Sequence, residues 1–255
     1  MFERGVSLVS KLIVLGNQAG DLDSMASSVA YAALCSLSLF GSSGVSAAQV
    51  LPIMPIPRAD FHLRREAVYV FQQAGISVDD LVFWDEVDLA TCMARANIVL
   101  VDHNELRADL VDLVDVGGEV WADSGSRVSG GVDQHVDKGK YLDAKPRIIE
   151  PVGSTATLVT QEFLRQGEAI PQEIVILLAG TLLLDTVNLD AQAGRVTAAD
   201  REAAAYLLPR CPLPREEYYA NIRAEKFNMQ GFTSEELLRK DYKERLLGTT
   251  RRGIA

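Results

Sequence analysis

Asp21 and Asp23 lie two positions apart in a glycine-bearing turn that follows a short apolar run. The run, residues 11–15, contains β-branched side chains and predicts a buried strand, and the small-residue segment 24–39 predicts a helix. Open α/β sheets bind ligands at this junction between a strand end and a helix N-terminus, and oxygen ligands there suit a hard divalent cation. Alternatively, the two acids only cap the helix and solvate a turn. Acids elsewhere in the chain that could reach the same place would favour a cation site over a capped turn.

Three more apolar segments each end in side chains that could bind a cation. If these segments belong to one parallel α/β domain, their ends meet at one edge of the sheet. Carboxylates with an occasional imidazole suit Mn²⁺ or Mg²⁺, and an acid after a very apolar helix needs a partner if it is buried. Together with the first pair, these segments predict a metal centre. Their polar residues are Asp102 with His103, Asp133 with Gln134 and His135, and Asp185.

The elements that must position these side chains alternate between strand-like and helix-like segments. The alternation predicts a parallel sheet with helices on both faces. Thr197 and Thr233 are each followed by an acid three residues later, which is the spacing of a capping box at a helix start. Residues 108–126 give too weak a signal to assign. The predicted strands are 11–15, 48–53, 81–83, 98–101, 128–132 and 148–150, and the predicted helices are 24–39, 63–74, 155–165, 173–184, 198–207 and 216–227.

Composition restricts the class of protein. The chain has 255 residues, 48% of them hydrophobic, and we expect it to bury a substantial core. Its formal net charge of −10 argues against binding to a nucleic-acid backbone, and an anionic substrate would need help from metal ions. No apolar run reaches the roughly 18 residues of a membrane helix, and the start of the chain lacks a signal-peptide pattern. We therefore expect a cytoplasmic protein without a membrane partner.

In this order, the motifs resemble the DHH phosphoesterases, specifically the branch of exopolyphosphatases and prune proteins, which is related to manganese-dependent inorganic pyrophosphatases. The resemblance covers nearly the whole chain. It implies a Rossmann-like, doubly wound catalytic domain over residues 1–224. Residues 225–255 are then a linker and the truncated start of a second domain. The resemblance rests on segments 16–17, 21–24, 101–104, 133–135, 151–159, 184–188, 231–233 and 237–243.

The resemblance also implies two divalent cations, Mn²⁺ in the first place and Mg²⁺ or Co²⁺ as alternatives. Such a pair, roughly 3.5–4 Å apart, lowers the pKa of a shared water and clamps phosphoryl oxygens. Asp21 is similar to a ligand of one metal, Asp23 to a ligand of the other, Asp102 to the bridging ligand and Asp185 to the residue that completes the second site. Asn17 stands where pyrophosphatases carry a metal-binding His, which favours the polyphosphatase branch.

The third motif departs from the family pattern of Asp-His-His, because this chain has Asp133, Gln134 and His135 there. Asp133 and His135 are expected to be catalytic, with His135 as the general acid that protonates the leaving phosphate. Gln134 takes the place of a metal-binding His. Since an amide oxygen binds Mn²⁺ more weakly than an imidazole does, the hypothesis is that Gln134 lowers metal affinity or activity.

Four side chains are expected to contact the phosphate chain. Lys243 matches a substrate-contacting lysine of the second domain, and His103 lies beside a predicted metal ligand. Arg58 or Arg64 could pair with a terminal phosphate, although an Arg on a solvated helix start is equally common. The backbone at residues 153–155 could also bind phosphate, but an ordinary helix cap is the preferred interpretation.

The sequence therefore predicts a metal-dependent hydrolase of phosphoanhydride bonds that releases orthophosphate from inorganic polyphosphate or short phosphate chains. A pyrophosphatase or a prune-like cyclic-nucleotide phosphodiesterase is an alternative within the enzymes. A weakly active or non-catalytic truncated homologue is the other alternative. It is favoured by Gln134 and by the expected loss of a closing domain after Ala255, since such a domain excludes water and stabilises the phosphates.

Overall fold

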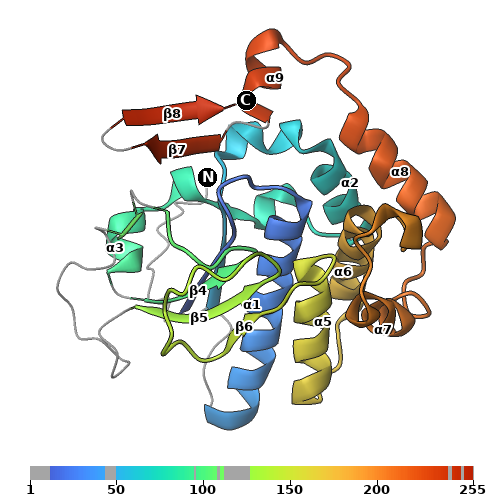
Figure 1. Cartoon of the computed structure of the whole chain (residues 1–255), viewed down its shortest axis with the longest axis horizontal. Helices are drawn as coiled ribbons and strands as arrows, with labels where there is room; N and C mark the ends of the chain where they lie inside the picture. The colour runs from blue at the N-terminus through green and yellow to red at the C-terminus, as the bar shows by residue number, and fades with distance from the viewer. Residues whose placement is uncertain are drawn as a thin grey trace.

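The computed structural model describes residues 12–43, 50–94, 96–107, 110–111, 127–240, 243–247 and 250–254. At its centre is a six-stranded sheet in the order β3-β2-β1-β4-β5-β6, and every pairing in it is parallel (Figure 1). The chain order reverses between β1 and β4, which is the point where doubly wound sheets bind ligands. The strands are β1 (Leu12–Leu15), β2 (Val50–Met54), β3 (Val82–Phe83), β4 (Asn97–Val101), β5 (Val128–Asp133) and β6 (Arg147–Ile149).

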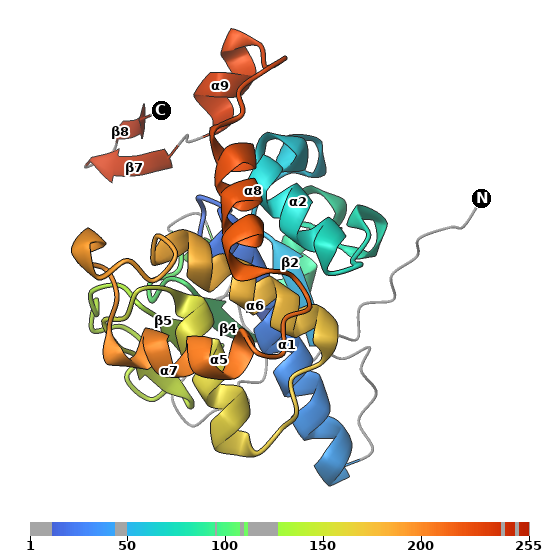
Figure 2. The ribbon, with the colours of Figure 1, turned by 90° about the vertical axis from the view of Figure 1, so that its right-hand side faces the viewer.

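Helices cover both faces of the sheet. On one face α1, α5 and α6 pack against one another, with α2, α7 and α8 outside them, and α3 lies on the other face (Figures 1 and 2). Within the described residues, no helix is both long and apolar enough to cross a membrane. The helices are α1 (Leu22–Ser43), α2 (Arg65–Gln73), α3 (Leu89–Met93), α5 (Thr155–Gln166), α6 (Gln172–Asp185), α7 (Ala198–Leu207), α8 (Arg215–Phe227) and α9 (Ser234–Lys240), and the 3-10 turns are η2 (Arg58–Leu63), η3 (Val78–Asp80), η4 (Trp84–Glu86) and η5 (Ala191–Ala193).

Strand side chains alternate between two cores, because successive residues of a strand point to opposite faces. Val14 of β1 and Val99 of β4 belong to the larger core, under α1, α5 and α6. Ile13 and Ile98, one position earlier in each strand, belong to the smaller core on the other face. All four side chains are buried, as in parallel sheets covered on both faces.

Residues 174–183 of helix α6 are nearly all apolar, and all of them are buried, as expected for a helix that is apolar all round. Gly180 allows Tyr218 of α8 to come close, since a Cβ at Gly180 would lie 2.5 Å from the Tyr218 hydroxyl oxygen. That hydroxyl donates a hydrogen bond to the carbonyl of Ile176 over 3.1 Å. This packing fixes the helix whose last residue is Asp185.

The predicted parallel sheet and its helices are confirmed, with shifted boundaries. The helix predicted over 63–74 begins at Arg65, after the 3-10 turn η2, and the strand predicted over 148–150 is β6, one residue earlier. The capping box at Thr197 is present, and Thr233 and Glu236 exchange the same hydrogen bonds. Residues 11 and 48–49 and most of 108–126 lie outside the described residues.

The C-terminal segment, from α8 to α9 (residues 215–240), packs against η2 and α2 (Figure 2). His62 Nε2 lies 3.0 Å from a carboxylate oxygen of Glu236 in α9. The guanidinium of Arg65 stacks 4.6 Å from the ring centroid of Phe232 and donates to the carbonyl of Gln230. Beyond α9, β7 (Lys243–Leu247) and β8 (Thr250–Ile254) form a separate antiparallel hairpin. The predicted domain boundary after residue 224 stays a prediction.

Candidate metal centre

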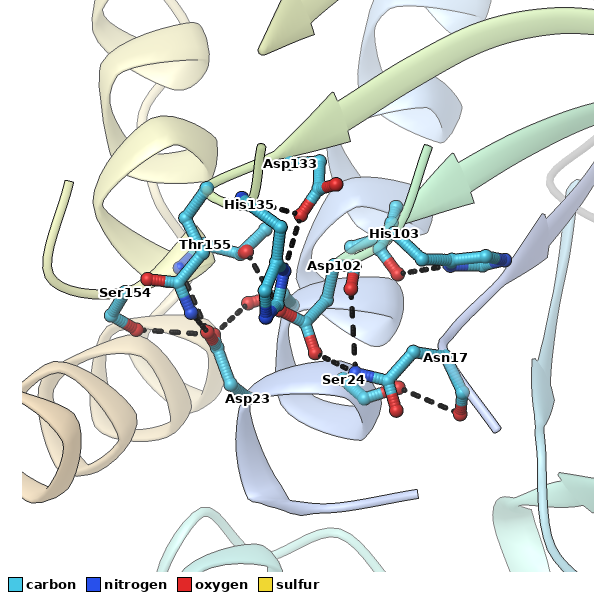
Figure 3. Close-up of polar contacts among 12 residues, drawn as sticks. Asn17, Asp23, Ser24, Asp102, His103, Asp133, His135, Ser154 and Thr155 are labelled. Carbon is cyan, nitrogen blue, oxygen red and sulfur yellow. Dashed lines mark hydrogen bonds and ion pairs between the residues drawn. The ribbon is translucent and has the colours of Figure 1, made fainter. Parts of the chain in front are cut away.

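Two loops at the switch point of the sheet bring acids together. β1 ends at Leu15 and leads into α1, whose second residue is Asp23, and Asp102 directly follows the neighbouring strand β4. Asp102 has a left-handed backbone (φ 64°), which few side chains adopt, and its N–H donates to the carbonyl of Val132 over 2.9 Å. Both carboxylates are buried and point into the same space (Figure 3).

The N-terminus of α5 points at Asp23. The backbone N–H groups of Thr155 and Ala156 donate to its carboxylate over 2.8 and 3.1 Å, and the Ser154 hydroxyl donates over 3.1 Å. The free N–H groups of a helix N-terminus favour an anion. In this structure the anion they hold is a side chain of the site. Ser154 also caps α5 by accepting from the N–H of Ala156, as the preferred interpretation expected.

The three acids Asp23, Asp102 and Asp185 are buried close enough to affect one another's ionisation. Burial and the charge of Asp21 raise the pKa of Asp23 to about 6. Burial, followed by the charges of Asp23 and Asp21, raises the pKa values of Asp102 and Asp185 well above the usual range. In addition, Asp185 Oδ2 is buried and has no hydrogen-bond partner within the described part of the chain. Clustered acids with an orphaned oxygen fit a divalent cation, whose charge would keep them ionised.

Strand β5 adds a carboxylate and an imidazole. Asp133 is fully buried, and its Oδ1 lies 2.7 Å from His135 Nδ1 and accepts the N–H of His135 over 3.0 Å. Burial opposes the ionisation of Asp133, but hydrogen bonds from His135 and Asn104 outweigh it and lower the pKa of Asp133. The same contact with Asp133 raises the pKa of His135. The pair therefore favours an ionised Asp133 and a protonated His135.

Ligand atoms of Asp102, Asp133 and His135 all lie within 4.8 Å of one another. This carboxylate and imidazole set could hold a cation such as Mn²⁺. The sequence placed Asp133 and His135 in one of the segments that predict the metal centre, and the resemblance gave the two residues catalytic roles. Their place beside Asp102 makes them candidate ligands as well.

The two predicted amide ligands contact the acids through their nitrogens. Asn17 Nδ2 donates to the carboxylate of Asp102 and, over 3.3 Å, to its carbonyl. Gln134 Nε2 donates to Asp23 Oδ2 over 3.0 Å. To bind a metal, each amide would have to turn its oxygen toward the ion, so the two ligand roles stay predictions.

Arg58 makes its contacts with residues that are not among the proposed metal ligands. Its guanidinium forms a bidentate contact with Glu86 over 2.5 and 2.9 Å and donates to the carbonyls of Val78 and Leu81 over 2.8 and 2.7 Å. Arg–carboxylate pairs with this geometry use the same donors that a phosphate would need. For Arg58 to contact phosphate, as predicted, it would have to leave these partners.

Arg64 is buried beside the loop that joins β1 to α1. Its Nε and Nη2 donate to the carbonyls of Gly20 and Ala19 over 3.0 and 2.6 Å. The guanidinium therefore supports the backbone directly before Asp21. The predicted contact of Arg64 with phosphate stays a prediction. The observed contacts indicate that Arg64 holds the loop that carries Asp21.

The other two predicted substrate contacts lie on different elements. His103 is half-buried, its Nδ1 lies 3.0 Å from the carbonyl of Val101, and burial lowers its pKa. Lys243 begins β7, and its side chain lies outside the described part of the structure. Both contacts with phosphate stay predictions.

Two supporting residues were missed by the sequence analysis. Asn104 Nδ2 donates to Asp133 and its Oδ1 accepts the N–H of Lys138 over 2.8 Å, which ties the strand ends of β4 and β5 together. Asp200 was recognised only as the capping partner of Thr197. The signal for Asn104 was its place in the segment 101–104, on which the resemblance rests. The partners of both residues are distant in sequence, and only the fold brings them close.

No protein-family model matches the chain. The chain is 34% identical over 238 residues to "Exopolyphosphatase PRUNE1" of Rattus norvegicus, which covers 91% of this chain and 48% of the rat protein. It is 28% identical over 237 residues to "Probable manganese-dependent inorganic pyrophosphatase" of Streptococcus agalactiae, with 92% of this chain and 67% of that protein covered. The chain thus spans about half the length of the curated exopolyphosphatase relatives it matches.

A solved structure from Methanococcus jannaschii, described as a family II inorganic pyrophosphatase, shares the fold. The TM-score is 0.67 at 20% identity, and the match covers 95% of this chain and 69% of the other. The fold, the order of the motifs and the sequence relatives agree. The resemblance to the DHH phosphoesterases of the exopolyphosphatase and prune branch, which is related to manganese-dependent pyrophosphatases, is therefore confirmed.

Proposed function

We propose that this chain is the catalytic part of a metal-dependent phosphohydrolase that releases orthophosphate from inorganic polyphosphate or short phosphate chains. The proposal is carried by the three acids Asp23, Asp102 and Asp185, which are clustered at the switch point, have raised pKa values and include an orphaned oxygen. Relatives named exopolyphosphatase support this substrate class. Relatives named pyrophosphatase support pyrophosphate as the second candidate substrate.

The residues proposed to hold two divalent cations are Asp21, Asp23, Asp102 and Asp185, with Asn17 and Gln134 beside them. Mn²⁺ is the preferred ion, and a relative named manganese-dependent supports it. When bound, the cations would supply a nucleophilic water at neutral pH and charge to stabilise phosphoryl oxygens.

The protein's own groups would orient the reactants and move one proton. Thr155 Oγ1 donates to Asp102 Oδ1 over 3.0 Å and Asn17 contacts the other oxygen, so the proposed bridging carboxylate is held on both sides. His135 is held through Nδ1 by Asp133, which raises its pKa. A protonated imidazole held in this way can deliver a proton from Nε2 to the leaving phosphate oxygen.

The proposal also includes a division into domains, the side chains that contact the substrate, and a location in the cell. Residues 1–224 would form the catalytic domain, and 225–255 the linker and the start of a second domain that presents Lys243 to the substrate. Arg58, Arg64 and His103 are the other proposed contacts. A cytoplasmic location goes with this function.

Phosphate release with Mn²⁺ tests the proposal on polyphosphate, tripolyphosphate, pyrophosphate and cyclic AMP. We expect release from polyphosphate by the unmodified chain and a loss of about a hundredfold or more in Asp102→Ala, because removal of a central electrostatic group has effects of that size. Asp190→Ala is the matched control, since Asp190 is exposed and caps only η5. Retained release in Asp102→Ala would overturn the mechanism. Intact Mn²⁺ binding without release from any substrate would favour the non-catalytic alternative.

A further inference from the structure

Asp200 in α7 has a fully buried carboxylate that is satisfied by hydrogen bonds alone. It accepts the N–H of Gly153 on both oxygens over 3.0 Å and the Thr157 hydroxyl over 2.6 Å. It also accepts the N–H and the hydroxyl of Thr197 over 2.7 and 2.8 Å. No described cation forms an ion pair with it. The carboxylate therefore joins the start of α7 to the turn at the start of α5.

That turn is the one that contacts the acids of the metal centre. Next to Gly153, Ser154 donates to Asp23 through its hydroxyl and Thr155 donates to Asp23 through its N–H. The Thr155 hydroxyl donates to Asp102 over 3.0 Å (Figure 3). Asp200 thus binds the two ends of a five-residue turn, 153–157, whose middle residues hold two of the proposed metal ligands.

The contact at Gly153 is too close to accept a side chain. A Cβ there would lie 2.8 Å from the carbonyl oxygen of Arg195, 2.9 Å from Asp200 Oδ2 and 2.9 Å from Thr186 Cγ2. Such tight packing transmits small displacements. Because Thr186 directly follows Asp185, a shift of this turn would also press on the third acid of the cluster.

The cap of α7 explains only the two contacts with Thr197 among the five that the Asp200 carboxylate accepts. The Thr197 N–H donates to the Asp200 carboxylate and the Asp200 N–H donates to the Thr197 hydroxyl, which together form the capping box of α7. The bonds with Gly153 and Thr157 belong to a different helix and are not part of a cap. Their common effect is to fix where α5 begins, and the N-terminus of α5 is what contacts Asp23.

We propose that Asp200 is a positioning residue of the metal centre: by holding residues 153–157 it sets the positions of Asp23 and Asp102 for binding a divalent cation. This inference rests on the proposed metal-dependent function. Residues that support metal ligands from behind typically change metal affinity 10- to 100-fold when mutated. Asp200 would act in this way without touching the cation or the substrate.

Calorimetric titration of the full chain with Mn²⁺ tests the proposal, with urea unfolding run on the same samples. In Asp200→Asn an NH2 group replaces one carboxylate oxygen and cannot accept the hydrogen bonds that this oxygen accepts, so we expect Mn²⁺ affinity to fall about tenfold or more. Thr197→Ala is the matched control, because it weakens the cap of α7 and leaves the bonds with Gly153 intact. It should lower the urea midpoint while Mn²⁺ affinity stays within about twofold of the unmodified chain.

Two further variants keep the test decisive if Asp200→Asn does not fold. Thr157→Val removes a single hydrogen bond to Asp200, and Gly153→Ala pushes the turn away from it. Both should weaken Mn²⁺ binding more than Thr197→Ala does at equal stability. If the folded variants bind Mn²⁺ as the unmodified chain does, Asp200 is only a helix cap and the inference is wrong. If the unmodified chain binds no Mn²⁺, the metal centre and this inference both fail, whereas intact binding without phosphate release overturns the proposed function alone.

Discussion

Gln134 is the residue that most alters the expected chemistry of the site. Its amide nitrogen donates to Asp23 Oδ2 over 3.0 Å, on a carboxylate that already accepts from the N-terminus of α5. An imidazole in this position would offer a lone pair to a cation. The amide N–H instead uses a lone pair of Asp23, so Gln134 competes with a metal for the same carboxylate.

Gln134→His should therefore raise Mn²⁺ affinity, by about tenfold, because imidazole is a better ligand and Asp23 regains a lone pair. Calorimetric titration measures the change. Gln192→His is a suitable control, since Gln192 is exposed in η5. Equal affinities for the unmodified chain and Gln134→His would show that position 134 does not limit metal binding.

The raised pKa of Asp23 gives the metal-free protein an unusual pH dependence. Its pKa is 3.8 ordinarily and about 6 in the folded chain, so between these values the folded state binds more protons than the unfolded state. Stability in EDTA should therefore fall as pH rises from about 4 to above 6, and Mn²⁺ should restore it. Urea unfolding at pH 5 and 7.5 measures this. Asp23→Asn should flatten the fall, and an unchanged pH profile in that variant would contradict the assignment.

At the scale of elements, apolar patterning predicts the sheet well because strand burial is local in sequence. The alternation of Val14 with Ile13 places β1 between two cores, and the acids follow the strand ends as expected. Contacts between distant segments could not be predicted. Arg64 was expected at phosphate, but its donors meet backbone carbonyls 44 and 45 positions away. The link between Asp200 and Gly153 likewise depends on how α7 packs on α5.

The packing of α6 against α8 leads to a prediction about stability. Gly180→Ala would place a Cβ 2.5 Å from the Tyr218 hydroxyl oxygen, and overpacking of this kind costs about 1–3 kcal/mol. Urea unfolding measures the loss. Tyr218→Phe in the same chain removes the clashing oxygen, so the double variant should lose less than the sum of the two single losses. Strict additivity would mean that the two side chains do not meet.

On the scale of the whole molecule, the acids and the C-terminal segment come from different parts of the fold. The acids lie at the start of α1, directly after β4 and at the end of α6, whereas α9 packs on η2 through contacts such as His62 with Glu236. The two regions are connected through η2, because Arg64 directly follows it and holds the loop before Asp21. Because the acids themselves lie on other elements than α9, and Arg64 keeps its own contacts with Gly20 and Ala19, metal binding should depend little on the segment after residue 227.

A chain that ends at residue 227 should fold and bind Mn²⁺ with nearly unchanged affinity. Its thermal midpoint should drop, because the cation–π contact between Arg65 and Phe232 and the buried contact of Lys240 with the Lys226 carbonyl are lost. Circular dichroism and calorimetry measure the two properties. A folded truncated chain that no longer binds Mn²⁺ would place part of the metal centre beyond residue 227 and would contradict the division of the chain near residue 224.

Mn²⁺ titration of the unmodified chain and of Asp102→Asn tests the metal centre most directly. Asp102 is buried between Asn17 and Thr155, and the neutral isostere keeps its shape while removing the charge at the centre of the cluster. We expect about two Mn²⁺ ions per unmodified chain and an affinity lower by about a hundredfold or more in Asp102→Asn. Equal Mn²⁺ binding by the two proteins would show that these acids do not form a metal centre.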